Sequence, residues 1–368
     1  MIGSLAQSVS GYFQQMSQCV GQGWNRFWYQ PSSPAPLALL RIGVALMAIY
    51  YVASFTPDLQ RWFGPQGWFA PYQQTSSSWT DAMAQWLSVQ FPVGETLYSF
   101  DDVAQPPLPP LYRLSYLTYA SRAWELWVLH AAGLLVLVLF ALGWKTRWMG
   151  VLGLVVVLAY LHRAPLLNSQ LEPVLAMLMF YLALSPCGAC WSLDRWLARK
   201  KDPEQPPAEK LSPRWSATVA RRLIQVHLIA LYTLIVLVQL SGGGTGGMVW
   251  WTGEAMWWIV ARPETALVSA DWLAHHPLLM DLWTYFVILF QLTFVVLVWV
   301  RPLRPLMLAL AVVFWFSIAL ATGQVAYSAL MLLGLVVFLP EELFLGRPQE
   351  EQAAAEPGGE TPREKAPA

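Results

Sequence analysis

The chain has 368 residues, of which 56% are hydrophobic and only 12% are charged, with 22 basic and 22 acidic side chains. An ordinary soluble domain carries about a quarter of its residues as charge, so this composition favours an integral membrane protein. It excludes intrinsic disorder over most of the chain, a nucleic-acid-binding protein with a basic face, and, with three cysteines, a disulfide-stapled secreted fold.

Residues 1–32 favour an amphipathic helix. Apolar side chains recur at steps of three and four between Leu5 and Trp28, which places them along one helical face. The segment lacks the basic start and the unbroken apolar run of a signal peptide. We expect it to lie in the membrane interface.

Eight apolar segments follow, within residues 33–345. About 20 apolar residues cross a hydrocarbon core of ~30 Å, and the third and fourth segments need their flanks to do so. The sequence therefore predicts an all-α, polytopic membrane helix bundle with about eight transmembrane helices. The segments are Pro36–Phe55, Ala123–Trp144, Arg147–Leu161, Leu171–Leu184, Leu223–Leu240, Leu282–Val300, Pro305–Ala321 and Val325–Pro340. Residues 346–368, rich in Pro, Glu, Ala and Gly, are expected to form a disordered tail.

The basic residues predict the orientation of the bundle. They concentrate in the loops after the second, fourth and sixth segments, which fall on one side together with both termini. The positive-inside rule then predicts cytoplasmic N- and C-termini. The long loops Thr56–Arg122 and Ser241–Asp281 would face out. They are rich in tryptophan, so we expect them to lie at the headgroup level or to cap the bundle, with a short interfacial helix over Met248–Ala261.

Three ionisable residues lie inside the predicted spans, where charge is costly. Arg41, near the cytoplasmic face, either snorkels to the headgroups or has a buried partner, and the pattern does not choose between the two. His130 lies deeper, where a hydrogen-bonded packing role is favoured over a proton relay or a ligand contact. For His227 a hydrogen-bonded packing role is favoured on the same grounds, and a functional role has even less support than for His130.

A denser polar group lies on the predicted outer side, at the turn into the fourth span and near the end of the fifth. A carboxylate beside a histidine and an arginine could perform acid–base chemistry on a ligand. The equally good alternative is an interfacial salt bridge that fixes the helix ends. The candidate pocket residues are His162, Arg163, Asn168, Gln170, Glu172, Gln239, Trp251 and Glu254.

Cys187 and Cys190 form a Cys-x-x-Cys motif at the cytoplasmic end of the fourth span. A redox pair would need a thioredoxin-like context, and a metal site would need two further ligands. Both are missing from the local sequence, so we interpret the two cysteines as packing residues and expect no metal site. Phosphate-binding, nucleophile-elbow and zinc-helix motifs are also missing.

The order of several motifs resembles the HTTM domain, the membrane module shared by vitamin K-dependent gamma-carboxylase and many bacterial proteins. The motifs are Leu37–Gly43, Trp62–Trp68, Asn168, Ser185–Asp194, Val238–Ser241, Trp251–Met256 and Arg301–Arg304. The resemblance covers residues 33–345 and implies a bacterial inner-membrane protein.

The resemblance does not extend to glutamyl carboxylation. In the animal carboxylase a lysine at the end of the matching span is thought to act as the base on reduced vitamin K. The matching residue here is Gln239, whose amide cannot abstract a proton. The family's Asn-Asn-His segment reads Asn168-Ser-Gln170, and the chain ends soon after the last span without a lumenal domain.

Three functions are consistent with these features. The first is binding of an apolar ligand such as a quinone or a lipid in the outer pocket, with redox or acid–base chemistry left open. The second is a non-enzymatic partner or assembly factor for a membrane or cytoplasmic protein, docking through Asp194–Arg222 and the tail. The third is a transporter, against which the sequence shows no internal repeat.

Overall fold

The computed structural model describes residues 2–64, 67–68, 115–120, 122–163, 167–202, 213–241, 245–261, 267, 271–340 and 342–345. Within these ranges every regular element is a helix, apart from an isolated bridge between Ser32 and Arg214. The predicted all-α class is confirmed for this part of the chain. The expected disordered tail, 346–368, and most of the first long loop lie outside the described residues.

Five helices are long and apolar enough to cross a bilayer, judged by length and composition. They are α2 (Ala35–Ala53), α5 (Ala123–Leu142), α9 (Trp215–Leu240), α12 (Pro277–Leu297) and α13 (Arg304–Thr322). Each falls on a segment that the sequence predicts to span the membrane. The helices support the coarse prediction of a helical membrane protein.

Three other predicted spans are also helical: α6 (Thr146–Arg163), α7 (Leu171–Leu184) and α14 (Val325–Gly334), which η6 (Leu335–Phe338) continues. The 14 residues of α7 rise about 21 Å at 1.5 Å per residue, less than the ~30 Å hydrocarbon core. The count of eight spans therefore stays a prediction.

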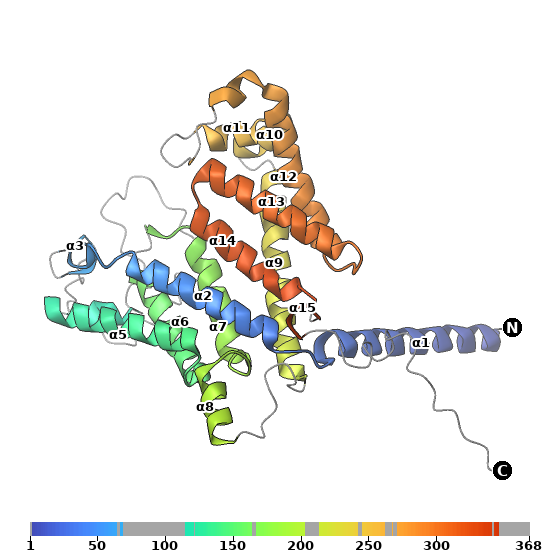
Figure 1. Cartoon of the computed structure of the whole chain (residues 1–368). Helices are drawn as coiled ribbons and strands as arrows, with labels where there is room; N and C mark the ends of the chain where they lie inside the picture. The colour runs from blue at the N-terminus through green and yellow to red at the C-terminus, as the bar shows by residue number, and fades with distance from the viewer. Residues whose placement is uncertain are drawn as a thin grey trace, which may run out of the picture.

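The helices pack as two groups that α14 joins. In the first group α2 packs on α5 and α7, and α6 packs on α5 and α7; in the second, α12 packs on α9 and α13. Between them, α14 contacts α2, α7 and α13 (Figure 1). Gly43 on α2 permits a close approach to α14, because a Cβ there would lie 2.7 Å from a Leu333 methyl carbon.

Short helices lie at both ends of the bundle. Figure 1 shows α10 (Thr245–Thr252) and α11 (Ala255–Val260) at one end, and α8 (Leu193–Lys201) at the other. We call the end at α8 the basic end of the bundle. The remaining elements are α1 (Ile2–Tyr29), α3 (Leu59–Phe63), η2 (Tyr116–Tyr119), η5 (Asp271–His275) and α15 (Glu342–Leu345).

The N-terminal helix, α1, contacts α9 near the basic end. The Arg222 guanidinium lies 4.4 Å from the centre of the Phe27 ring, and its Nε donates to the Phe27 carbonyl at 3.1 Å. A cation over an aromatic face is favourable, so these contacts tie the last turns of α1 to α9.

The single helix expected over Met248–Ala261 is wrong, because the segment forms two helices, α10 and α11. The break falls at Gly253, whose φ of +89° is a backbone conformation that glycine adopts readily. A Cβ at this position would also lie 2.9 Å from an Asp281 carboxylate oxygen. The glycine thus turns the chain and lets it approach α12.

Candidate functional site

The Arg41 guanidinium is fully buried, with 0% of the residue exposed. Its Nη1 donates to the Cys187 carbonyl at 2.9 Å, and its Nη2 donates to the Trp191 carbonyl at 2.6 Å. Hydrogen bonds from a charged donor are the stronger kind, so this pair fixes the loop between α7 and α8 onto α2. Of the two alternatives for Arg41, the structure selects the buried partner over snorkelling.

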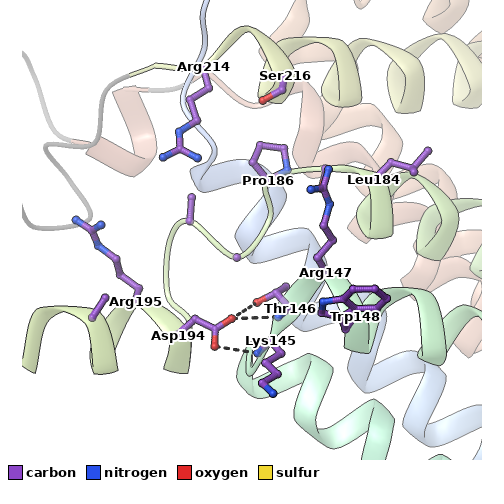
Figure 2. A pocket seen from close by; sticks show the side chains of 14 residues that line it. Lys145, Thr146, Arg147, Trp148, Leu184, Pro186, Asp194, Arg195, Arg214 and Ser216 are labelled. Atoms are coloured by element: carbon purple, nitrogen blue, oxygen red, sulfur yellow. Dashed lines mark hydrogen bonds between the residues drawn. The ribbon is translucent and has the colours of Figure 1, made fainter. Parts of the chain in front are cut away.

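The same loop is held from the other side by Asp194. Its carboxylate accepts from the Lys145 N–H at 2.8 Å, from the Thr146 N–H at 3.0 Å and from the Thr146 hydroxyl at 3.2 Å (Figure 2). Ser192 caps α8 by accepting from the Arg195 N–H at 3.1 Å. The Ser185–Asp194 motif therefore has a structural explanation, the joining of three helix ends.

Cys187 and Cys190 are free, buried thiols within this loop. Burial raises the pKa of both thiols, although the nearby Arg41 charge acts in the opposite direction. A raised pKa lowers the thiolate fraction that reacts or binds metal. The described residues hold no group of three or more metal-ligating side chains. The geometry agrees with the packing interpretation.

His130 occupies a different setting, in the first half of α5. The residue is 2% exposed, and both ring nitrogens have partners. Its Nδ1 lies 2.6 Å from the Tyr160 hydroxyl on α6, and its Nε2 lies 2.9 Å from the Thr56 hydroxyl just beyond α2. A neutral imidazole donates from one nitrogen and accepts at the other, so each tautomer satisfies both contacts.

Two more tyrosines complete what we call the histidine–tyrosine cluster: Tyr51, Thr56, Tyr116, His130 and Tyr160. Tyr51 and Tyr116 both lie near Tyr160, close enough that a charge on one phenol would be felt by the other. The Tyr116 hydroxyl oxygen is buried, and within the described residues it has no hydrogen-bond partner. Burial raises the pKa of Tyr116 to about 12, so this side chain stays a neutral donor.

Gly133 allows η2 to approach α5 at the cluster. A Cβ there would lie 3.2 Å from the Tyr116 hydroxyl and 3.2 Å from a Val156 methyl carbon on α6. Both distances are tighter than ordinary van der Waals contacts. The absence of a side chain at this position therefore brings the tyrosine against the helix that carries His130.

The turn between α6 and α7 lies beside the cluster and contains five of the predicted pocket residues. Glu172 Oε2 accepts from the Ser169 N–H at 2.6 Å and from the Ser169 hydroxyl at 2.9 Å, and the carboxylate also interacts electrostatically with Tyr51. The Asn168 side chain donates to the Leu161 carbonyl at 2.9 Å. These bonds close the turn, which favours a structural role for both residues.

The other three members of this turn differ in burial. Arg163 ends α6 and is buried, whereas Gln170 is exposed. His162 is half-buried, and its Nδ1 has no hydrogen-bond partner within the described residues. His162 and Arg163 lie in the last turn of α6 and Glu172 lies in the first turn of α7, so all three border the same connection.

Gln239, Trp251 and Glu254 belong to the second helix group. Trp251 Nε1 donates to the Leu240 carbonyl at 3.1 Å, which ties α10 to the end of α9 next to Gln239. Glu254 lines a pocket of about 380 Å³ together with Trp257, Trp258 and Asp281. The helices α10 and α11 pack on α9 and α12, so these three candidates join a tryptophan-rich region separate from the turn that carries Glu172.

His227 on α9 forms a second histidine–tyrosine pair, with its Nδ1 3.0 Å from the Tyr181 hydroxyl on α7. It is half-buried and nearer the basic end of the bundle. The hydrogen bond and the ring contact, with centroids 5.8 Å apart, fit the packing role that the sequence favours.

The sequence reasoning missed Tyr51, Tyr116 and Tyr160. Thr56, Tyr160 and His130 are brought together from positions 74 and 30 residues apart, so no short motif contains them. A polar ring inside or beside an apolar segment is the one local signal that could have drawn attention to these tyrosines.

Comparisons of the chain with protein-family models, with curated proteins and with solved structures found no match. The geometry of the sites is therefore the basis for any functional conclusion.

Proposed function

We propose that the chain is an HTTM-type protein of the bacterial inner membrane, with about eight spans and both termini in the cytoplasm. Five apolar helices support the membrane location. The orientation is supported by one pocket at the basic end, to which Lys145 contributes from the loop after the second segment and Arg195 and Arg214 from the loop after the fourth. Basic residues from loops that the sequence assigns to one side do lie together.

Cysteine labelling tests the orientation. A single cysteine at Pro203, placed in a variant without native cysteines, is expected to react with a membrane-impermeant maleimide only after the membrane is opened. A matched cysteine at Trp68, in the first outer loop, should react in intact spheroplasts. Labelling of position 203 from outside would overturn the orientation.

We further propose that the histidine–tyrosine cluster binds an apolar ligand with a polar head, such as a quinone. The observation that carries this proposal is the buried Tyr116 hydroxyl, which has no partner among the described residues although it lies beside the His130–Tyr160 pair. Unsatisfied buried donors are rare and call for an acceptor. A quinone carbonyl oxygen is an acceptor on an otherwise apolar molecule.

The composition of the surroundings fits such a ligand. Tyr160 is flanked by the Phe55 ring, stacked at 5.5 Å, and by the Phe63 ring at 5.6 Å. Small-molecule sites combine mostly apolar walls with a few polar groups that fix orientation. Polar and ionisable residues inside a membrane bundle are costly, and this cost is accepted mainly at functional sites.

The test compares co-purified quinone in the wild-type protein and in matched variants, by lipid extraction and native mass spectrometry. Tyr116→Phe removes only the unpaired hydroxyl, and His130→Gln disrupts the central pair. His227→Gln is the control, because it removes a histidine from an equivalent tyrosine bond elsewhere in the bundle.

Retention of a quinone by the wild-type protein and by the His227 variant, with loss from the Tyr116 variant, is the expected result. Equal retention of quinone by the wild-type protein and all three variants would refute ligand binding at the cluster. A wild-type protein that neither co-purifies with quinone nor binds added quinone would refute it as well. The second outcome would favour a partner or assembly role, for which α8 offers an exposed surface with Trp196, Leu197 and Arg199.

A further inference from the structure

A second cavity is the pocket at the basic end of the bundle, which the histidine–tyrosine cluster does not line. Its volume is about 800 Å³, within the range of ligand-binding pockets. It is formed where the start of α6, the end of α7, the α7–α8 loop and the start of α9 meet (Figure 2). The lining residues are Lys145, Thr146, Arg147, Trp148, Leu184, Ser185, Pro186, Gly188, Ala189, Asp194, Arg195, Ala198, Arg214 and Ser216.

The charge of this pocket is strongly positive. Four basic side chains line it, against the single carboxylate of Asp194. That carboxylate is already occupied by three hydrogen bonds from the α5–α6 turn. Figure 2 shows the Arg147 and Arg214 guanidinium groups extending into the space beside Pro186. Neither of these two arginines forms an ion pair within the part of the chain that the structure describes.

The pocket also opens onto an apolar surface. Trp148 and Leu184, which are 71% and 59% exposed, line it together with the arginines. On α6 the exposed apolar surface continues from Trp148 through Leu152 and Val155, at the spacing that keeps side chains on one helical face. Such a strip on a membrane helix faces acyl chains.

We propose that this pocket binds an anionic phospholipid of the leaflet at the basic end. The phosphodiester lies between Arg147 and Arg214, and an acyl chain follows the strip that starts at Trp148. Arginine forms paired hydrogen bonds with phosphate oxygens, and basic pockets between membrane helices are known to hold anionic lipid headgroups. The shared chemistry is that of a phosphate, and the adjoining apolar strip favours a lipid over free phosphate as its source.

The concave arrangement distinguishes this site from ordinary basic residues at a membrane surface. Its cations come from the α5–α6 turn, from the first turn of α6, from α8 and from the residue that precedes α9, around one cavity. By contrast, Arg199 and Lys200 on α8 are exposed and do not line it. They provide a control with the same change in net charge.

The experiment uses the full-length protein in detergent, stripped of lipid and titrated with cardiolipin, phosphatidylglycerol or phosphatidylcholine, with binding measured by native mass spectrometry. The Arg147→Gln/Arg214→Gln variant is compared with the Arg199→Gln/Lys200→Gln control. Loss of two basic groups is expected to weaken binding of the anionic lipids about 25-fold, at about fivefold for each group. The control should bind as the wild type does, and phosphatidylcholine should bind weakly to all three.

Equal losses of affinity for anionic lipid in the two double variants would show that the effect is general charge attraction, and this would contradict the proposed site. Unchanged affinity in the Arg147→Gln/Arg214→Gln variant would contradict it as well. Trp148→Ala separates the two sources of phosphate. This substitution should weaken the binding of anionic lipid. It should leave unaltered the ability of inorganic phosphate to displace bound lipid from the arginines. If the pocket binds inorganic phosphate and Trp148→Ala has no effect on lipid binding, the assignment of the ligand as a lipid is wrong.

Discussion

Replacing Arg41 with leucine tests the role of the buried guanidinium in holding the α7–α8 loop. The substitution retains an apolar side chain in the core but leaves the Cys187 and Trp191 carbonyls without their donor. An unpaired buried carbonyl costs about 1–3 kcal/mol, and removal of the buried charge recovers part of its desolvation cost. We expect a net loss of about 2–4 kcal/mol of unfolding free energy.

This loss should lower the apparent melting temperature in detergent by about 3–5 °C, as followed by tryptophan fluorescence. Arg301→Leu is the control, because Arg301 is exposed in the turn between α12 and α13. The released loop should also make Cys190 reactive toward a maleimide below the melting temperature. An Arg41→Leu protein that melts with the wild type and keeps Cys190 protected would show that the loop does not depend on the arginine.

Three further outcomes concern the same end of the bundle. Cys19 is exposed, whereas burial raises the pKa of Cys187 and Cys190. At about pH 8 a maleimide should therefore label Cys19 alone in the native protein. Detection of labelled Cys187 by mass spectrometry would contradict this prediction. Asp194→Ala removes a carboxylate that accepts three hydrogen bonds and should cost about 2–3 kcal/mol, measured by the same melting assay. Gly143→Ala forces a side chain into a backbone with φ of +76°, which costs about 1–2 kcal/mol before any clash; an unchanged melting temperature would contradict that strain.

The long helices were predictable because lipid leaves an apolar segment few alternatives. With no water to satisfy the backbone, a run of about 20 apolar residues must form a helix, as α5 and α12 do. Shorter runs such as α7 were recognisable as helices, but their length does not decide whether they span. The break at Gly253 was missed because a glycine in an apolar segment is compatible with a continuous helix as well as with a turn.

The candidate sites were predictable only in part, because their contacts join distant segments. Arg41 was identified from its cost in a membrane, but its carbonyl partners lie 146 and 150 residues away. His130 was found by the same argument, while its partner Tyr160 carries no charge and gives no comparable signal. The polarity of the local sequence therefore identifies a residue that is energetically costly to bury. The partner that forms its hydrogen bonds can be identified only from the folded structure.

Quinone binding at the histidine–tyrosine cluster can be located by photo-crosslinking of the purified protein with an azido-quinone, followed by peptide mapping. Label is expected on peptides that carry the histidine–tyrosine cluster, above all those with Tyr116 and His130, and this label should be lost in the presence of excess unlabelled quinone. Label confined to the tryptophan-rich region around Trp257 and Trp258, or label that excess quinone does not displace, would contradict it.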